Sequence, residues 1–272
     1  MTAFASRPRR HDPPPDPSGI VDTAGSIARF AARLLRAIPH VRHYGGEALR
    51  QAAIVVTSST LVIIALAFFA GGSCGLESSA LARAFGAAPV AGGFSAWCTL
   101  REVIPFVFGY IVAAKIGCAM VAELAAMRVA EEVDQLDGMG LNSLAYLAGT
   151  RFVACAVTLP FAYVLSVGSG YAAAALMSLG RFGDVSPGTW KLFFLAFQGS
   201  SDLIYSLAKG LTISAFVIIV ALHEGYGLRA RGPVEVGTAA ARSMAISIVG
   251  VTLISMAGTL IFWGANPRIP IG

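Results

Sequence analysis

Charged residues are scarce in this chain. Only 13% of its 272 residues are Asp, Glu, Lys or Arg, whereas 56% are hydrophobic and the mean hydropathy is +0.71. Water-soluble domains carry about 25% charged residues, so a soluble fold of this composition would expose large apolar areas to water. The scarcity of charge excludes an ordinary soluble protein and favours a bundle of membrane-spanning helices.

Motifs for common enzyme and metal chemistry are also missing. The sequence has no G-x-x-x-x-G-K-[ST] phosphate-binding loop, no H-E-x-x-H zinc motif and no C-x-x-C pair. Residues 71–75 match G-x-S-x-G, but that hydrolase signature needs a strand-to-helix turn, and here it ends an apolar helix where we expect the chain to leave the membrane. We therefore predict no catalytic residue, no metal site and no cofactor bound by this chain.

Cysteine is limited to four residues. Cys118 and Cys155 lie in apolar runs and are predicted to be small packing residues. Cys74 and Cys98 could both face the outer compartment, where disulfides are permitted. The sequence leaves open whether they pair.

The N-terminal 50 residues differ from the rest of the chain. Residues 1–25 are rich in Pro and Arg and predict a disordered basic tail without the apolar core of a signal peptide. Residues 26–38 place apolar side chains on one helical face, opposite Arg29, Arg33 and Arg36, and Pro39 then breaks the pattern. A basic amphipathic helix favours a place in the membrane interface for the 26–50 region. The alternative is a solvated helix packed on a partner protein.

Five long apolar runs follow, at about 52–72, 103–124, 152–178, 202–222 and 243–264. About 20 helical residues cross the ~30 Å hydrocarbon core of a bilayer. The runs predict an all-α membrane protein with five spans over 51–265 and an outer tail at 266–272. The length of the third span and its Pro160 predict a kink or a tilt there. The segment 187–199 is too short to cross, and its Trp190 and Lys191 suggest a helix at the interface.

The basic residues are distributed unevenly about the spans. Thirteen of the 20 Lys and Arg precede the first span or follow the second or fourth, and five fall on the other side. The positive-inside rule places the N-terminus in the cytoplasm and the C-terminus outside. Aromatic residues are not interleaved with the basic ones, so we predict no nucleic-acid partner.

Two features lie inside the spans. Small residues recur every four positions in the second span at Gly109, Ala113 and Gly117, which favours close helix packing. Lys115 and Lys209 are cations within apolar runs, where an unpaired charge costs ~2.5–3.5 kcal/mol.

Glu102 and Asp202 are the candidate counter-ions for these two lysines. Ion pairs that lock helices together are the favoured interpretation, because buried charges are more often paired than free. A polar patch in the path of a substrate is the alternative, and Arg101 belongs to the same set of candidates.

The connection after the second span is acidic. From Glu123 to Asp137 it holds five acids and one base, Arg128. Helical spacing places Glu131 and Asp134 on one face. The other candidate contact residues are Glu132, Leu136, Met139 and Gly140, and Gly138 and Gly140 can end the helix. We interpret the segment as a lever for a partner protein; the alternative is a solvated loop helix.

This segment resembles the E-x-x-D-A-L-x-x-M-G loop of the MlaE/YrbE permeases, and further motifs agree in order over about residues 25–265. They are the R-E-x-x-P of Arg101–Pro105, the A-G-R-x-G-like run Ala114–Gly117, Arg151, the D-x6-K of Asp202 and Lys209, and the loop residues Gly225–Gly227 and Gly232–Gly237. The chain departs from the family pattern at Gln135, usually alanine, and at Ser143, usually proline.

The resemblance implies a permease subunit of an ABC-type lipid transporter, with 123–140 as the helix that docks on a cytoplasmic ATPase holding ATP and Mg²⁺. The basic N-terminus and Gly/Ala-rich composition resemble the YrbE permeases of actinobacterial Mce systems. That likeness implies a second permease, identical or paralogous, extracytoplasmic MCE-domain proteins, and import of fatty acids, sterols or phospholipids through the inner membrane. A membrane-embedded lipid-modifying enzyme and a structural scaffold are the alternatives.

Overall fold

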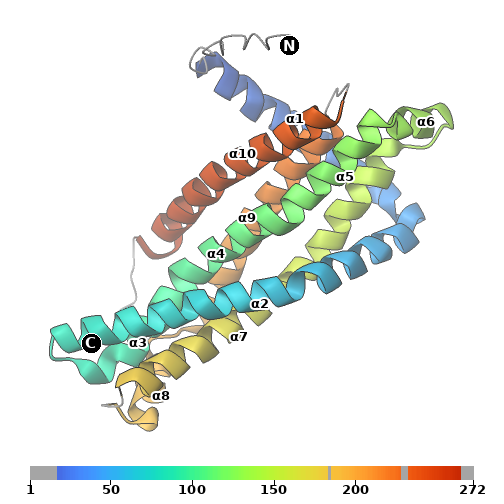
Figure 1. Ribbon diagram of the computed structural model, residues 1–272. Coiled ribbons are helices and arrows are strands. Elements are labelled where there is room, and N and C mark those ends of the chain that lie inside the picture. Colours follow the sequence, from blue (N-terminus) through green and yellow to red (C-terminus); the bar gives the residue numbers. More distant parts are fainter. Residues whose placement is uncertain (1–16, 183–184, 228–231, 265–272) are drawn as a thin grey trace, which may run out of the picture.

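The computed structural model describes residues 17–182, 185–227 and 232–264, and these residues form helices and short connections without a strand. Ten α-helices are described, numbered as in Figure 1. They are α1 (Pro17–Val41), α2 (Gly45–Ala84), α3 (Ala91–Trp97), α4 (Ile104–Ile111), α5 (Cys118–Val129), α6 (Glu132–Gly138), α7 (Thr150–Phe182), α8 (Pro187–Ala196), α9 (Ser200–Tyr226) and α10 (Pro233–Thr259).

Short segments of other helix types join them. The π-helical segments are η3 (Cys98–Val103), η4 (Val112–Gly117), η5 (Leu144–Gly149) and η6 (Leu260–Gly264), and the 3₁₀ turns are η1 (Arg42–Tyr44) and η2 (Ala88–Val90). Because η3 and η4 continue into α4 and α5, the second predicted span lies in one continuous helical stretch, Ala88–Val129.

The five predicted spans are confirmed. Five helical stretches among the described residues are long and apolar enough to cross a membrane, and each contains one of the predicted runs. The helices extend beyond those runs: α2 continues to Ala84, so residues 71–75 lie inside a helix and the expectation that the helix ends there is wrong.

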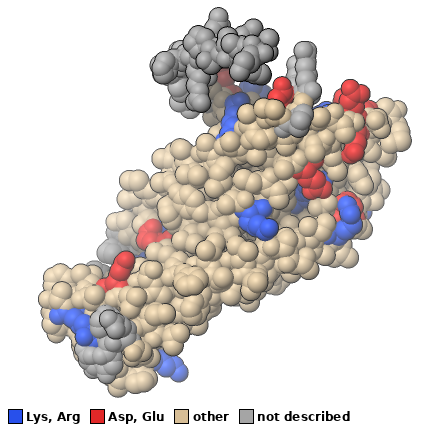
Figure 2. All heavy atoms as spheres, in the orientation of Figure 1, with Lys and Arg blue, Asp and Glu red and all other residues tan. Residues whose placement is uncertain are grey.

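The bundle is elongated, with different elements at its two ends (Figure 1). Helices α2 and α7 run side by side over most of their length, α4 and α9 pack beside them, and α5 and α10 pack on α9 and on each other. Helices α1 and α6 lie at one end, here called the α6 end, and α3 and α8 lie at the other, here called the α8 end. Charged side chains on the face shown in Figure 2 gather toward these ends, with few on the middle.

Close packing of α2 on α7 depends on glycine. A Cβ atom at Gly71 would lie 2.2 Å from the main-chain oxygen of Gly170, and one at Gly75 would lie 2.4 Å from that of Ala174. Real Cβ atoms do not approach so closely, so only glycine allows the two backbones this contact.

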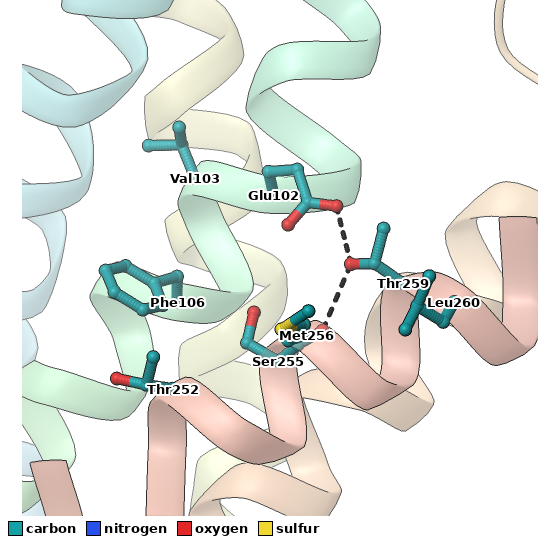
Figure 3. A pocket seen from close by; sticks show the side chains of 8 residues that line it. All are labelled: Glu102, Val103, Phe106, Thr252, Ser255, Met256, Thr259 and Leu260. Carbon is teal, nitrogen blue, oxygen red and sulfur yellow. Dashed lines mark hydrogen bonds between the residues drawn. The ribbon is translucent and has the colours of Figure 1, made fainter. Parts of the chain in front are cut away.

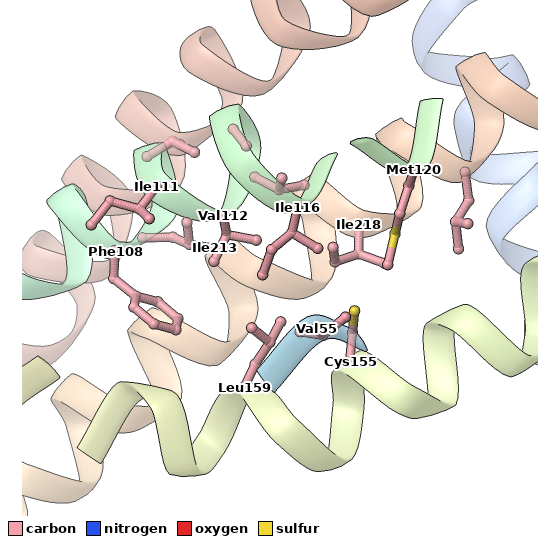
Figure 4. Close-up of a cluster of buried hydrophobic side chains, with 14 of the residues drawn as sticks. Val55, Phe108, Ile111, Val112, Ile116, Met120, Cys155, Leu159, Ile213 and Ile218 are labelled. Carbon is pink, nitrogen blue, oxygen red and sulfur yellow. The ribbon is translucent and has the colours of Figure 1, made fainter. Parts of the chain in front are cut away.

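The largest apolar cluster lies where α4, α5, α7 and α9 meet (Figure 4). The predicted small-residue face of the second span points into it. A Cβ at Gly109 would lie 2.4 Å from Cγ2 of Ile213, Ala113 is buried, and Gly117 lies near Ala221. These residues seat the second span against α9.

The N-terminal region differs from its prediction in three ways. Helix α1 begins at Pro17, so residues 17–25 are helical rather than part of a tail; residues 1–16 and 265–272 lie outside the described part. Pro39 does not break the helix, which continues to Val41. Phe30 and Leu34 are buried, whereas Leu35 is 53% exposed, so the buried face is narrower than the apolar pattern indicated.

The α8 end is held together by a disulfide, which the sequence left open, and by buried aromatic side chains of α8. A disulfide joins Cys74 of α2 to Cys98 of η3. The ring of Trp190, which together with Lys191 suggested an interfacial helix, is buried and stacks on Phe194 at 4.7 Å. Helix α8 packs on α3, where Ala96 belongs to the same buried cluster as Trp190 and Phe194.

Candidate functional site

Two charged residues of the second span are paired with residues of α9 near the α8 end. Arg101 donates to Oδ2 of Asp202 at 3.3 Å, and both side chains are at most 10% exposed. The Arg101 guanidinium also lies 4.3 Å from the ring centre of Trp97. Asp202 accepts at its other oxygen from Nε1 of Trp263 at 2.6 Å. The pair therefore has hydrogen-bonded and cation–π partners from three spans.

Lys209 joins the same three spans about two turns further along α9 than Asp202. Its ammonium donates to the main-chain oxygen of Arg101 at 2.8 Å, to Oε2 of Glu102 at 3.1 Å and to Oγ1 of Thr259 at 2.7 Å. The ammonium has three donors and three acceptors here, and its side chain is fully buried. This geometry agrees with the interpretation of Lys209 as a lock between helices.

Glu102 differs from its neighbours because its side chain is 48% exposed. It accepts from Thr259 at 2.6 Å and lines a groove of about 450 Å³ between the start of the second span and α10 (Figure 3). The other lining residues are Val103, Phe106, Thr252, Ser255, Met256, Thr259 and Leu260. A mostly apolar groove of this size with one carboxylate at its wall suits an amphiphilic ligand.

Lys115 is not part of this network. It lies on η4 with an exposed side chain, and within the part of the chain that the structure describes no carboxylate pairs with it. Of the two lysines inside spans, only Lys209 is therefore brought to a predicted counter-ion.

At the α6 end, the acidic segment is two helices rather than one. Helix α5 ends at Val129, and Glu131 has a positive φ of 57° immediately before α6. The left-handed conformation costs a non-glycine residue ~1–2 kcal/mol. Glu131 and Asp134 therefore do not share a helical face as predicted, because the backbone turns between α5 and α6.

Helix α6 and the residues beside it form an exposed, acidic surface over residues 131–141, here called the α6 tip. Glu131, Glu132, Asp134 and Asp137 are all exposed, and so are Met139, at 68%, and Leu141. Val133 is fully buried and Leu136 packs against the core, which holds α6 on the bundle. Gly140 follows with a φ of 77°, a conformation that glycine adopts without strain.

Two of the predicted coupling residues are bound within the chain. Glu123 accepts from Arg151 of α7 at 2.5 Å, and Arg151 is buried, so this pair fixes α5 to α7. Arg128 donates to Oδ1 of Asp134 at 3.1 Å and to the main-chain oxygen of Tyr226 at 2.8 Å.

Sequence analysis missed Trp97, Thr259 and Trp263. A signal for them was available, because Trp97 precedes Arg101 by four residues and Trp263 follows Thr259 by four, which places each pair on one helical face. Among the described residues, no cluster of three or more His, Cys, Asp or Glu side chains is arranged to hold a metal ion.

Comparison of the sequence with known proteins shows the family to which the chain is related. Residues 48–261 match the family described as permease MlaE. The chain is 24% identical over 210 residues to the intermembrane phospholipid transport system permease protein MlaE of Haemophilus influenzae, covering 76% of this chain and 80% of that protein.

Two further relatives are similar to this chain at the same level of identity. A probable ABC transporter permease protein of Rickettsia felis is 26% identical over 238 residues, or 84% of this chain and 88% of the relative. The chloroplastic protein TRIGALACTOSYLDIACYLGLYCEROL 1 of Arabidopsis thaliana is 26% identical over 179 residues, 65% of this chain and 51% of that protein.

Proposed function

Because the chain belongs to the MlaE permease family, we propose that it is the membrane-spanning subunit of an ABC-type transporter that moves lipid through the inner membrane. The observation that carries the proposal is the family match over residues 48–261, which includes the Glu102 groove and the exposed α6 tip. The chain is a non-catalytic, multi-pass membrane subunit, as permeases of this family are.

The α6 tip is the proposed docking site for the ATPase. Exposed carboxylates beside the apolar side chains of Met139 and Leu141 provide both charge and contact area for a partner. ATP and Mg²⁺ would be bound by that partner, which lies in the cytoplasm. The positive-inside distribution supports this orientation, with the N-terminus also cytoplasmic and the C-terminus outside.

The groove beside Glu102 is the proposed lipid contact. It lies near the α8 end, which this orientation directs away from the cytoplasm. A mostly apolar wall suits acyl chains or a sterol ring, and Glu102 offers a hydrogen-bond acceptor to a head group. Fatty acids, sterols and phospholipids are the proposed substrates, and import is the proposed direction.

The remaining partners follow from the likeness to YrbE permeases of Mce systems. We propose a second permease, identical or paralogous, and MCE-domain proteins beyond the α8 end. Mass spectrometry of the complex extracted in mild detergent from its native membrane tests these partners. An ABC ATPase, a second permease and MCE-domain proteins are expected; recovery of the chain alone, from a preparation that preserves other membrane complexes, would refute the proposal.

Charge reversal at the α6 tip tests the docking site. Glu131→Lys combined with Asp134→Lys should lower ATP-dependent lipid transfer by the reconstituted complex by about tenfold or more. Each change puts a positive side chain where the proposed contact uses a negative one, so the electrostatic complementarity with the ATPase is lost. Glu77→Lys is the matched control, since Glu77 is an exposed acid of α2 toward the α8 end. Normal transfer by the double variant would exclude α6 as the docking site.

The hydrolase alternative has a structural argument against it. Ser73 of the G-x-S-x-G match lies within α2, and its hydroxyl donates to the main-chain oxygen of Phe69 one turn earlier. A serine bonded to its own helix is not activated as a nucleophile. Ser73→Ala should therefore leave lipid transfer unchanged.

A further inference from the structure

Tyr226, the last residue of α9, has contacts with three other elements at the α6 end. Its main-chain oxygen accepts from Nε of Arg128 at 2.8 Å, and the guanidinium of Arg128 lies 4.5 Å from the centre of its ring. Its hydroxyl is 2.8 Å from the hydroxyl of Ser143, at the start of η5. Its ring also lies 6.2 Å from that of Phe30 in α1.

The two residues that hold Tyr226 also hold α6. Arg128 binds Asp134 inside α6 at 3.1 Å. The main-chain nitrogen of Ser143 donates to Oδ1 of Asp137, near the end of α6, at 3.3 Å. Each of these two polar links from α6 leads through one residue to Tyr226, so a displacement of α6 changes the forces on the end of α9.

Helix α9 is suited to carry such a displacement. It is an unbroken α-helix of 27 residues, about 40 Å long. The second span contains the π-helical segments η3 and η4, and α7 contains Pro160, features at which helices bend. At its far end α9 carries Asp202 and Lys209, and Lys209 contacts both walls of the groove through Glu102 and Thr259.

We infer that Tyr226 is a positioning residue that fastens the ATPase-docking helix α6 to α9, and that α9 transmits the movement of α6 to the groove. The inference rests on the proposed function, in which an ATPase moves α6. Tyr226 contacts neither the groove nor the exposed tip, so its effect is on the coupling between them and not on either site.

A fluorescent reporter in the groove tests the inference. Leu260, 59% exposed in the groove wall, is replaced by cysteine and labelled with bimane, with Cys118→Ser and Cys155→Ala removing the free thiols. The labelled chain is assembled with its ATPase in nanodiscs. The change in fluorescence on adding ATP and the rate of ATP hydrolysis are measured on the same sample.

The variants distinguish the contribution of the Tyr226 hydroxyl from the contribution of its ring, and both from a nonspecific effect of substitution. Tyr226→Phe and Ser143→Ala each remove the same hydrogen bond, and Tyr226→Ala removes the ring as well. Tyr146→Phe is the matched control, because Tyr146 packs edge-on against Tyr44. Retention volume on size exclusion confirms that each variant is folded.

We expect Tyr226→Phe to lower the ATP-dependent signal per ATP hydrolysed about two- to tenfold, the range for one hydrogen bond. Ser143→Ala should match it, and the double variant should be no worse than either, because both remove one interaction. Tyr226→Ala should abolish the signal, and Tyr146→Phe should retain it.

Two contrary results would distinguish a failure of the inference from a failure of the proposed function. A full signal in folded Tyr226→Ala overturns the inference and leaves the proposed function standing. An absent signal with Tyr226 intact, in a complex that hydrolyses ATP, overturns the proposed function and the inference with it.

Discussion

Replacing Lys209 by methionine separates the structural role of this lysine from a role in contacting substrate. Methionine keeps the length of the side chain but removes the ammonium. Three acceptors then lose their donor: the main-chain oxygen of Arg101, the carboxylate of Glu102 and the hydroxyl of Thr259. If Lys209 locks the helices together, the variant must be less stable, whatever happens to transport.

The size of the effect follows from the surroundings. Breaking a fully buried ion pair costs about 3–5 kcal/mol, but Glu102 is 48% exposed and keeps its bond from Thr259, which lowers the cost. We expect Lys209→Met to destabilise the bundle by about 2 kcal/mol, the range for hydrogen bonds to a charged group. For chains of this size that is about 4–8 °C in melting temperature.

Melting in detergent, followed by intrinsic tryptophan fluorescence, measures this shift. Adding Glu102→Gln to Lys209→Met should recover part of the loss, because it removes the carboxylate left without its cation. Lys191→Met is the matched control, since Lys191 is exposed on α8, and it should melt like the unmodified chain. If Lys209→Met melts normally and yet abolishes lipid transfer, Lys209 contacts substrate and the structural interpretation is refuted.

Three further predictions concern packing, covalent linkage and backbone strain. Gly75→Ala should destabilise the chain by about 2 kcal/mol or more, because its Cβ would lie 2.4 Å from a main-chain oxygen of α7; Gly168→Ala, with no atom within 4 Å, should melt unchanged. Under denaturing conditions a maleimide-polyethylene glycol should tag two cysteines before reduction and four after it; four tags without reductant would contradict the bond between Cys74 and Cys98. Glu131→Gly should raise the melting temperature, by the equivalent of about 1 kcal/mol, because it relieves a φ of 57°; an unchanged or lower melting temperature would contradict this.

Much of the fold was predictable because membrane helices are specified locally. A run of about 20 apolar residues must form a helix in a bilayer, since no water is present to bind the backbone. All five spans are therefore found where the apolar runs predict them. Helix ends were less predictable: α2 passes through Gly71 and Gly75 because α7 packs on them, and no local signal reveals that neighbour.

The sequence identified the charged residues of the candidate site better than it identified which of them form ion pairs. Glu102, Asp202 and Lys209 were candidates as charges in apolar surroundings, and the structure places all three in one network. Their partners could not be assigned from spacing, because Arg101 and Asp202 are 101 positions apart. Lys115 satisfied the same criterion, yet it lies on an exposed face of η4.

The sequence by itself determined that the protein lies in a membrane, how many spans it has and how its charges are distributed about them. Each of these depends on composition over about one helix length. The tertiary structure alone decided which charges pair, that Cys74 bonds to Cys98, that Glu131 turns the backbone before α6, and that Tyr226 joins α6 to α9. These features depend on contacts between segments far apart in the chain, and the register and rotation of packed helices, not hydrophobicity, bring those segments together.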